Sequence, residues 1–151
     1  MRTVIQRVTH ASVRVPADGY EAGIEKGLLV LAAFIDDDTD EDLEWTARKI
    51  AAMRIFDDAE GVMNLSVKDV EGDILAVSQF TLYASTVKGN RPSYIKAAKP
   101  EVAIPLYEKF LILLERELQK DVAKGIFGAD MKIELLNDGP VTIIVDSKLK
   151  F

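Results

Sequence analysis

The chain has 151 residues, of which 48% are hydrophobic and 29% are charged, and its formal net charge is −6. The negative charge argues against a general affinity for nucleic acid, because phosphate binding relies on clustered cations. The absence of cysteine excludes disulfides and thiol chemistry, and no apolar run approaches the roughly 18 residues of a membrane span. The start of the chain has no signal-peptide pattern. We therefore expect a cytoplasmic protein with a single domain over residues 1–151.

The first third of the chain predicts strands. Residues 4–8 and 12–15 alternate between apolar and polar side chains and predict two paired strands, with a connection near residues 9–11. Residues 20–24 predict a short strand. Residues 27–34 form a continuous apolar run, which is typical of a buried central strand.

The rest of the chain adds two helices and further strands. Asp38 or Thr39 is expected to cap one helix, because acidic residues follow in its first turn. Residues 73–84 predict the clearest strand, and a second helix is expected from Pro100 to about residue 120. Residues 131–146 predict two closing strands. This order favours an α+β fold with largely antiparallel β-sheet layers and two main helices packed on one side.

Candidate catalytic residues lie in the strand predicted over residues 73–84. Strict alternation would place Gln79 and Thr81 on one face and Ser78 and Phe80 on the other. Gln79 and Thr81 offer donors and acceptors, but a threonine and a glutamine that satisfy a strand end would look the same. A single histidine and no cysteine make a zinc site or a serine triad improbable, so we expect no metal and no cofactor.

Two further segments are candidates for substrate binding. Residues 86–99 carry lysines and an arginine but no acid, so Lys88 and Arg91 are available to phosphate, and Tyr94 is available to stack on a base. An ordinary surface loop would fit this composition equally well. Gly139 and Pro140 connect the two closing strands, and on base rates such a pair is a simple turn.

The chain closely resembles the D-aminoacyl-tRNA deacylases over almost its full length. Its matching motifs are Ser78-Gln79-Phe80-Thr81-Leu82-Tyr83-Ala84, Lys88-Gly89-Asn90-Arg91-Pro92-Ser93, Phe127-Gly128-Ala129-Asp130-Met131 and Asn137-Asp138-Gly139-Pro140-Val141-Thr142. Tyr94 replaces the phenylalanine that often follows the Arg-Pro-Ser motif, which is a conservative change.

The resemblance implies a homodimer whose active sites lie at the subunit interface. The residues matching Gly139 and Pro140 would form a Gly-cisPro element that enters the pocket of the partner subunit. That pocket would bind the 3′-terminal adenosine of a charged tRNA. The expected catalytic residues are Ser78, Gln79, Phe80 and Thr81. The expected substrate-binding residues are Gly139, Pro140, Met131, Asn137, Arg91, Pro92 and Lys88.

The implied reaction is hydrolysis of the ester bond of D-aminoacyl-tRNA, with L-amino acids rejected sterically and glycyl-tRNA accepted. Thr81 is the obvious nucleophile, but no neighbouring base is apparent, so we favour assistance by the vicinal 2′-OH of the substrate. Two other readings stay open. One is a tRNA-binding module without turnover, and the other is a hydrolase of small esters or amides.

Overall fold

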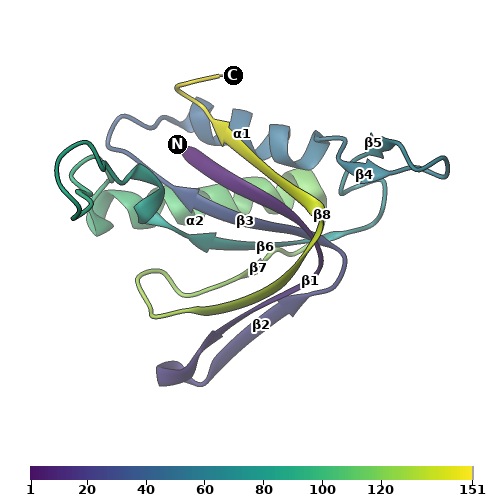
Figure 1. Ribbon diagram of the computed structural model, residues 1–151, viewed down its shortest axis with the longest axis horizontal. Helices are drawn as coiled ribbons and strands as arrows, with labels where there is room; N and C mark the ends of the chain where they lie inside the picture. Colours follow the sequence, from purple (N-terminus) through teal and green to yellow (C-terminus); the bar gives the residue numbers. More distant parts are fainter. Residues whose placement is uncertain (151) are drawn as a thin grey trace.

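A computed structural model describes residues 1–150 (Figure 1). The elements follow one another as β1 (Arg2–Val15), η1 (Pro16–Asp18), β2 (Tyr20–Ile24), β3 (Gly27–Ala33), α1 (Asp40–Ala52), β4 (Phe56–Asp57), β5 (Met63–Leu65), β6 (Asp73–Ser78), η2 (Phe80–Tyr83), α2 (Pro100–Leu118), β7 (Ala123–Lys124) and β8 (Lys132–Asp146). The main sheet has the order β2-β1-β3-β6-β7, with β8 also paired to β1, while β4 and β5 form a separate two-stranded sheet. The expected α+β class is confirmed, although β6 runs parallel to both β3 and β7.

Strand β1 is one long strand, so the predicted pairing of residues 4–8 with residues 12–15 is wrong. Its first half pairs with β3 and its second half with β2, while β8 runs antiparallel along most of its length. The alternation breaks near residues 9–11 because the ladder to β8 shifts register at Gln6/Val8 and Val8/His10. Such irregularities bend a strand without ending it. Figure 1 shows β1 and β8 bending together, which curls the sheet.

Strand β8 shows the same difference between pattern and structure. The two closing strands predicted within residues 131–146 are one 15-residue strand, with residues 137–140 at its irregular centre. Residues 137–140 therefore lie within β8, and the pairing of β8 with β1 continues on both sides of them.

The two helices pack against each other and cover one face of the sheet. Helix α1 begins at the expected cap, because the Thr39 side chain accepts from the backbone N–H of Asp42 and the Asp42 side chain accepts from that of Thr39. Both helices bury apolar stripes in the larger core, and Phe110 and Leu114 of α2 are fully buried there. A second cluster lies within the curl, where Val13 of β1 packs with residues of β3 and β6.

Candidate active site

The Ser-Gln-Phe-Thr motif forms a turn at the end of β6. The strand predicted over residues 73–84 stops at Ser78, and the 3-10 turn η2 follows from Phe80 to Tyr83. The backbone N–H of Gln79 still donates to the carbonyl of Ala32 at 2.7 Å, which ties the start of the turn to β3. The prediction that the strand continues beyond Ser78 to residue 84 is therefore wrong. A short turn can continue the apolar pattern of a strand.

Gln79 and Thr81 nevertheless meet. The Gln79 side-chain amide donates a hydrogen bond of 2.6 Å to the Thr81 hydroxyl oxygen. Among residues 1–150 this is the one side-chain hydrogen bond recorded for either group, and it involves no ionisable partner. Thr81 thus has no base beside it to activate it as a nucleophile.

A cavity of about 300 Å³ opens beside this turn, and we call it the Gln79 cavity. It is lined by the ends of β3 and β6, by the start of α2 and by the segment that leads into β8. Its lining residues are Ala32, Ala33, Phe34, Ser78, Gln79, Phe80, Ala98, Ala103, Phe127, Gly128, Ala129, Asp130, Met131 and Ile133. Four residues of the expected site therefore line this cavity, namely Ser78, Gln79, Phe80 and Met131. Thr81 does not line it but is hydrogen-bonded to Gln79.

Aromatic packing fixes the wall of the Gln79 cavity from behind. The ring of buried Tyr107 lies 6.4 Å from that of Phe34 and 5.8 Å from that of Phe127. The Tyr107 hydroxyl donates to the carbonyl of Ala76 in β6 at 3.0 Å. Burial raises the pKa of the Tyr107 phenol, so it remains a hydrogen-bond donor at neutral pH. The wall is apolar and tied to the central strands.

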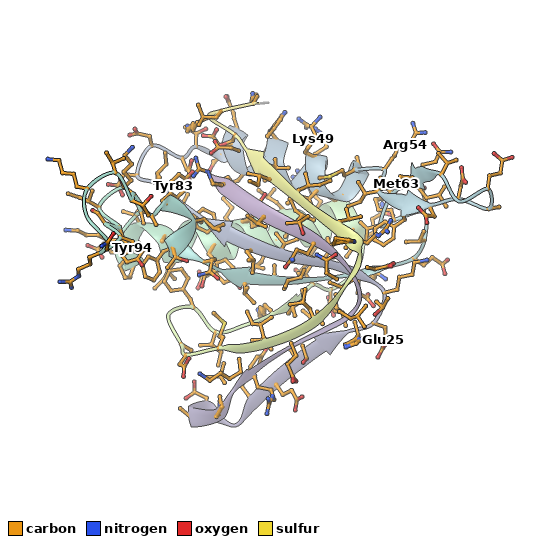
Figure 2. The ribbon with its side chains drawn as sticks, viewed as in Figure 1. Glu25, Lys49, Arg54, Met63, Tyr83 and Tyr94 are labelled. Carbon is orange, nitrogen blue, oxygen red and sulfur yellow. The ribbon has the colours of Figure 1, made fainter. Side chains whose placement is uncertain are left out.

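The basic loop of residues 88–94 adjoins the Gln79 cavity but does not line it. Ser85 and Ser93 exchange two backbone hydrogen bonds of 2.8 and 2.9 Å, which close the loop at its base. Tyr94 packs edge-on against exposed Phe80 with 5.1 Å between ring centroids. Figure 2 shows Tyr94 and Tyr83 at the same end of the molecule. Lys88, Pro92 and Arg91 lie on this loop outside the cavity, and both cationic side chains are exposed.

The Gly139–Pro140 corner lies apart from the Gln79 cavity. The peptide bond between Gly139 and Pro140 is cis, Gly139 has a φ of 136°, and both residues are exposed. The Asn137 side chain spans the corner, accepting from the backbone N–H of Val141 at 2.8 Å and donating to the Thr142 hydroxyl at 3.0 Å. Gly139, Pro140 and Asn137 are therefore not brought together with the motif of residues 78–81 within one chain.

Arg7 is a residue of this corner that the sequence did not single out. Its side chain is only 9% exposed and donates to the carbonyls of Asp138 at 2.9 Å and Ile55 at 2.7 Å. A Cβ added to Gly139 would lie 3.0 Å from an Arg7 nitrogen. The alternation of β1 could have identified Arg7, because Thr3, Ile5 and Arg7 occupy successive inward positions of this strand. An arginine is rarely buried at such a position unless it is paired.

Residues 1–150 contain no helix that is both long and apolar enough to cross a membrane. Over the same residues, no three side chains of His, Asp or Glu gather as a potential metal site. The Gln79 cavity offers hydroxyl, amide and backbone groups, and one carboxylate, that of Asp130, which accepts from Lys132 Nζ at 3.0 Å.

Comparison with known proteins identifies the family. The sequence profile of the family described as D-Tyr-tRNA(Tyr) deacylase matches residues 4–146. The D-aminoacyl-tRNA deacylases of Flavobacterium johnsoniae and Parabacteroides distasonis are 63% and 62% identical to this chain, over 98% and 99% of both sequences respectively.

Two solved structures have a similar fold. One described as c-Myc DNA Unwinding Element Binding Protein has a TM-score of 0.87 at 41% identity, covering 97% of this chain and 98% of its own. Another, described as a probable eukaryotic D-amino acid tRNA deacylase, has a TM-score of 0.82 at 21% identity, covering 95% and 97%, and it supports the fold alone. The resemblance noted in the sequence is confirmed, and this chain belongs to the D-Tyr-tRNA(Tyr) deacylase family.

Proposed function

We propose that this chain hydrolyses the ester bond of D-aminoacyl-tRNA and releases the free D-amino acid and tRNA. Family membership over residues 4–146 supports the reaction. The observation that carries the assignment of the site is the Gln79 cavity, because Ser78, Gln79 and Phe80 of the motif line it and Thr81 is hydrogen-bonded to Gln79.

The 3′-terminal adenosine would occupy the Gln79 cavity. Its volume of about 300 Å³ is at the lower end for small-molecule sites, and its alanine and phenylalanine walls suit a flat base. Phe80 at the rim is 55% exposed and therefore free to stack. Lys88 and Arg91 on the adjoining loop would contact phosphates, while the net charge of −6 limits contact with the rest of the tRNA.

Catalysis would rest on positioned donors. The backbone N–H groups of Phe80 and Thr81 begin η2, where the first N–H groups of a helical turn have no partner within the turn, and within residues 1–150 no loop or turn carbonyl accepts from them, so they would be available to an oxyanion. Water would attack the ester carbonyl carbon, the C–O bond to the ribose would break, and the ribose oxygen would take up a proton. The vicinal 2′-OH of the substrate would assist this transfer, with Gln79 and Thr81 holding it in place.

The Gly139–Pro140 corner of a second copy of the chain would select D-aminoacyl over L-aminoacyl groups. The corner is exposed, it is held by Arg7 and Asn137, and neither Gly139 nor Pro140 lines the Gln79 cavity of its own chain. Leu136 and Ile144 nearby in β8 are each 49% exposed, which suits a contact with another copy. We infer a homodimer in which the carbonyl oxygens of Gly139 and Pro140 bind the substrate amino group and leave no space for an L side chain.

Three further points belong to this proposal. Glycine has no side chain to exclude, so glycyl-tRNA would be hydrolysed as well. Residues 1–151 would form one catalytic domain. The absence of cysteine and the tRNA substrate both favour a cytoplasmic location.

The test is deacylation of D-Tyr-tRNA, L-Tyr-tRNA and Gly-tRNA by the purified chain. Release of D-tyrosine and glycine, with L-Tyr-tRNA left intact, is expected. Equal rates for the two tyrosine enantiomers would contradict chiral selection, and binding without turnover would reduce the chain to a tRNA-binding module.

A further inference from the structure

A second cavity, of about 410 Å³, lies on the other side of η2, and we call it the Lys96 cavity. Phe80 of the turn lines the Gln79 cavity, and Tyr83 of the same turn lines the Lys96 cavity. The flanking segments divide in the same way, since Ala98 borders the first cavity and Lys96 the second. One turn, about 8 Å long, therefore separates the two spaces.

The lining of the Lys96 cavity is cationic. Arg2, Lys96 and Lys148 contribute positive charges, and Asp146 contributes the negative charge. The Asp146 carboxylate is already engaged, because it accepts from Arg2 Nε at 2.8 Å and from the backbone N–H groups of Lys148 and Leu149 at 2.8 and 3.0 Å. These bonds lower the pKa of Asp146 against the opposing effect of its burial.

The three cationic side chains differ in how many hydrogen bonds and ion pairs they already make within the protein. Lys148 is held by Asp42 at 2.6 Å, and Arg2 uses Nε and one terminal nitrogen, the latter on the carbonyl of Leu82 at 3.0 Å. Lys96 is exposed and makes no recorded ion pair within residues 1–150. Within residues 1–150, the Lys96 ammonium and part of the Arg2 guanidinium therefore remain available to a ligand.

Tyr83 forms the wall behind these groups. The Arg2 guanidinium lies 4.8 Å from the centre of its ring. Tyr83 is 8% exposed, and its hydroxyl is the one buried side-chain polar atom without a hydrogen-bond partner in residues 1–150. A buried donor left unpaired costs stability and calls for a functional explanation.

We propose that the Lys96 cavity binds a backbone phosphate of the single-stranded 3′ end of the substrate RNA. This inference rests on the proposed function, because it takes the terminal adenosine to be in the Gln79 cavity. The strand would then cross η2, and its next phosphate would meet Lys96 and the free edge of Arg2. The acidic residues behind Lys148, among them Asp42, would repel a longer run of phosphates, so the contact is confined to one group.

The test compares Lys96→Gln with Lys68→Gln, a matched exposed lysine between β5 and β6 that lines neither cavity. Binding of adenosine, the trinucleotide CpCpA and inorganic phosphate is measured by titration at several salt concentrations. Lys96→Gln should weaken CpCpA binding about fivefold at 0.1 M salt and reduce the salt slope by about 0.7. Adenosine binding should not change, and Lys68→Gln should behave as the unaltered chain.

Three outcomes would overturn the proposal. One is CpCpA binding that is insensitive to Lys96→Gln. Another is an equal fall in adenosine binding, which would mean a structural effect on the Gln79 cavity. Inorganic phosphate that binds as tightly as CpCpA would make the cavity a free-anion site.

Hydrolysis of D-Tyr-tRNA separates this inference from the proposed function. If the unaltered chain hydrolyses it while CpCpA binding ignores Lys96, only the phosphate site fails. If the chain does not hydrolyse it, the proposed function fails, and the CpCpA titration still decides the phosphate site.

Discussion

The side-chain amide of Gln79 donates its 2.6 Å hydrogen bond to the oxygen of Thr81, and the direction of this bond defines what Thr81 can do. The oxygen already accepts, while the hydroxyl proton remains free to be donated. Thr81 is thereby suited to orient a substrate oxygen, and within residues 1–150 its side chain is hydrogen-bonded to no ionisable group that could act as a base.

Replacement of Thr81 tests this role. Thr81→Ala should lower kcat/KM for D-Tyr-tRNA about tenfold, the equivalent of one lost hydrogen bond. Thr81→Ser keeps the hydroxyl and should retain most of the activity. A loss of many orders of magnitude in Thr81→Ala, with tRNA binding intact, would identify Thr81 as the nucleophile.

The substrate hydroxyl should matter more than Thr81. A D-aminoacyl-tRNA that ends in 2′-deoxyadenosine should be hydrolysed about 10² to 10⁴ times more slowly, because it lacks the group that assists proton transfer. Single-turnover rates with ribose and deoxyribose termini give the comparison. Equal rates would rule out assistance by the 2′-OH.

The hydrogen bond itself predicts coupling between its two partners. Gln79→Ala should release the Thr81 hydroxyl from its orientation, so that the double variant Gln79→Ala/Thr81→Ala loses less than the sum of the two single effects. A double-mutant cycle in kcat/KM measures this coupling. Additive effects would show that the two side chains act independently.

The sequence predicted the helices better than the strands. Both helices have apolar stripes, and Thr39 caps α1 through local contacts that the sequence encodes within four residues. The bend in β1 was misread as a connection because a register shift and a turn break alternation alike, and the partner that distinguishes them, β8, is far along the chain.

The candidate site shows the same difference between local motifs, which the sequence reveals, and tertiary contacts, which it does not. The motif of residues 78–81 could be found in the sequence, but alternation placed Gln79 and Thr81 on a strand face instead of in a turn. Arg7 was missed because its partners, Asp138 and Ile55, are distant in sequence. Tertiary contacts of this kind leave only an indirect trace in a local pattern.

The Gly139 corner should tolerate no side chain. In Gly139→Ala the added Cβ would lie 2.8 Å from a Val141 methyl group and 3.0 Å from Arg7, at a φ of 136°. The displaced corner should lower D-Tyr-tRNA deacylation about a hundredfold.

Gly61→Ala is the matched control. Gly61 also has a positive φ, of 77°, but nothing lies within 4 Å of its added Cβ. The variant should lose about 1 kcal/mol of unfolding free energy and keep its activity. Equal activity of the Gly139→Ala and Gly61→Ala variants would remove the corner from the catalytic account.

Stability should fall in acid through Asp42. Burial raises the pKa of Asp42, but hydrogen bonds from Lys148, Thr39 and Ser147 outweigh it and hold the pKa well below its ordinary value. A carboxyl whose folded pKa is depressed stabilises the fold above its unfolded pKa of about 4, and this contribution is lost as the pH falls below that value.

Lys148→Met should weaken this acid dependence. Urea unfolding between pH 7 and pH 3 should give a shallower fall in unfolding free energy than in the unaltered chain. Parallel curves for the two proteins would show that the Lys148–Asp42 pair contributes nothing to the acid dependence.

The pairing of β1 with β8 has a consequence for how the protein is made. Arg2 bonds to Asp146 across 144 positions, and Arg7 reaches Asp138 across 131. Contacts of such long range form late and slowly, because the intervening chain must first be ordered. During synthesis the residues of the Ser-Gln-Phe-Thr turn precede β8, so the Gly139–Pro140 corner and the β1–β8 pairing that supports it must wait for the later segment. We therefore expect the proposed site to be complete only after β8 has paired with β1.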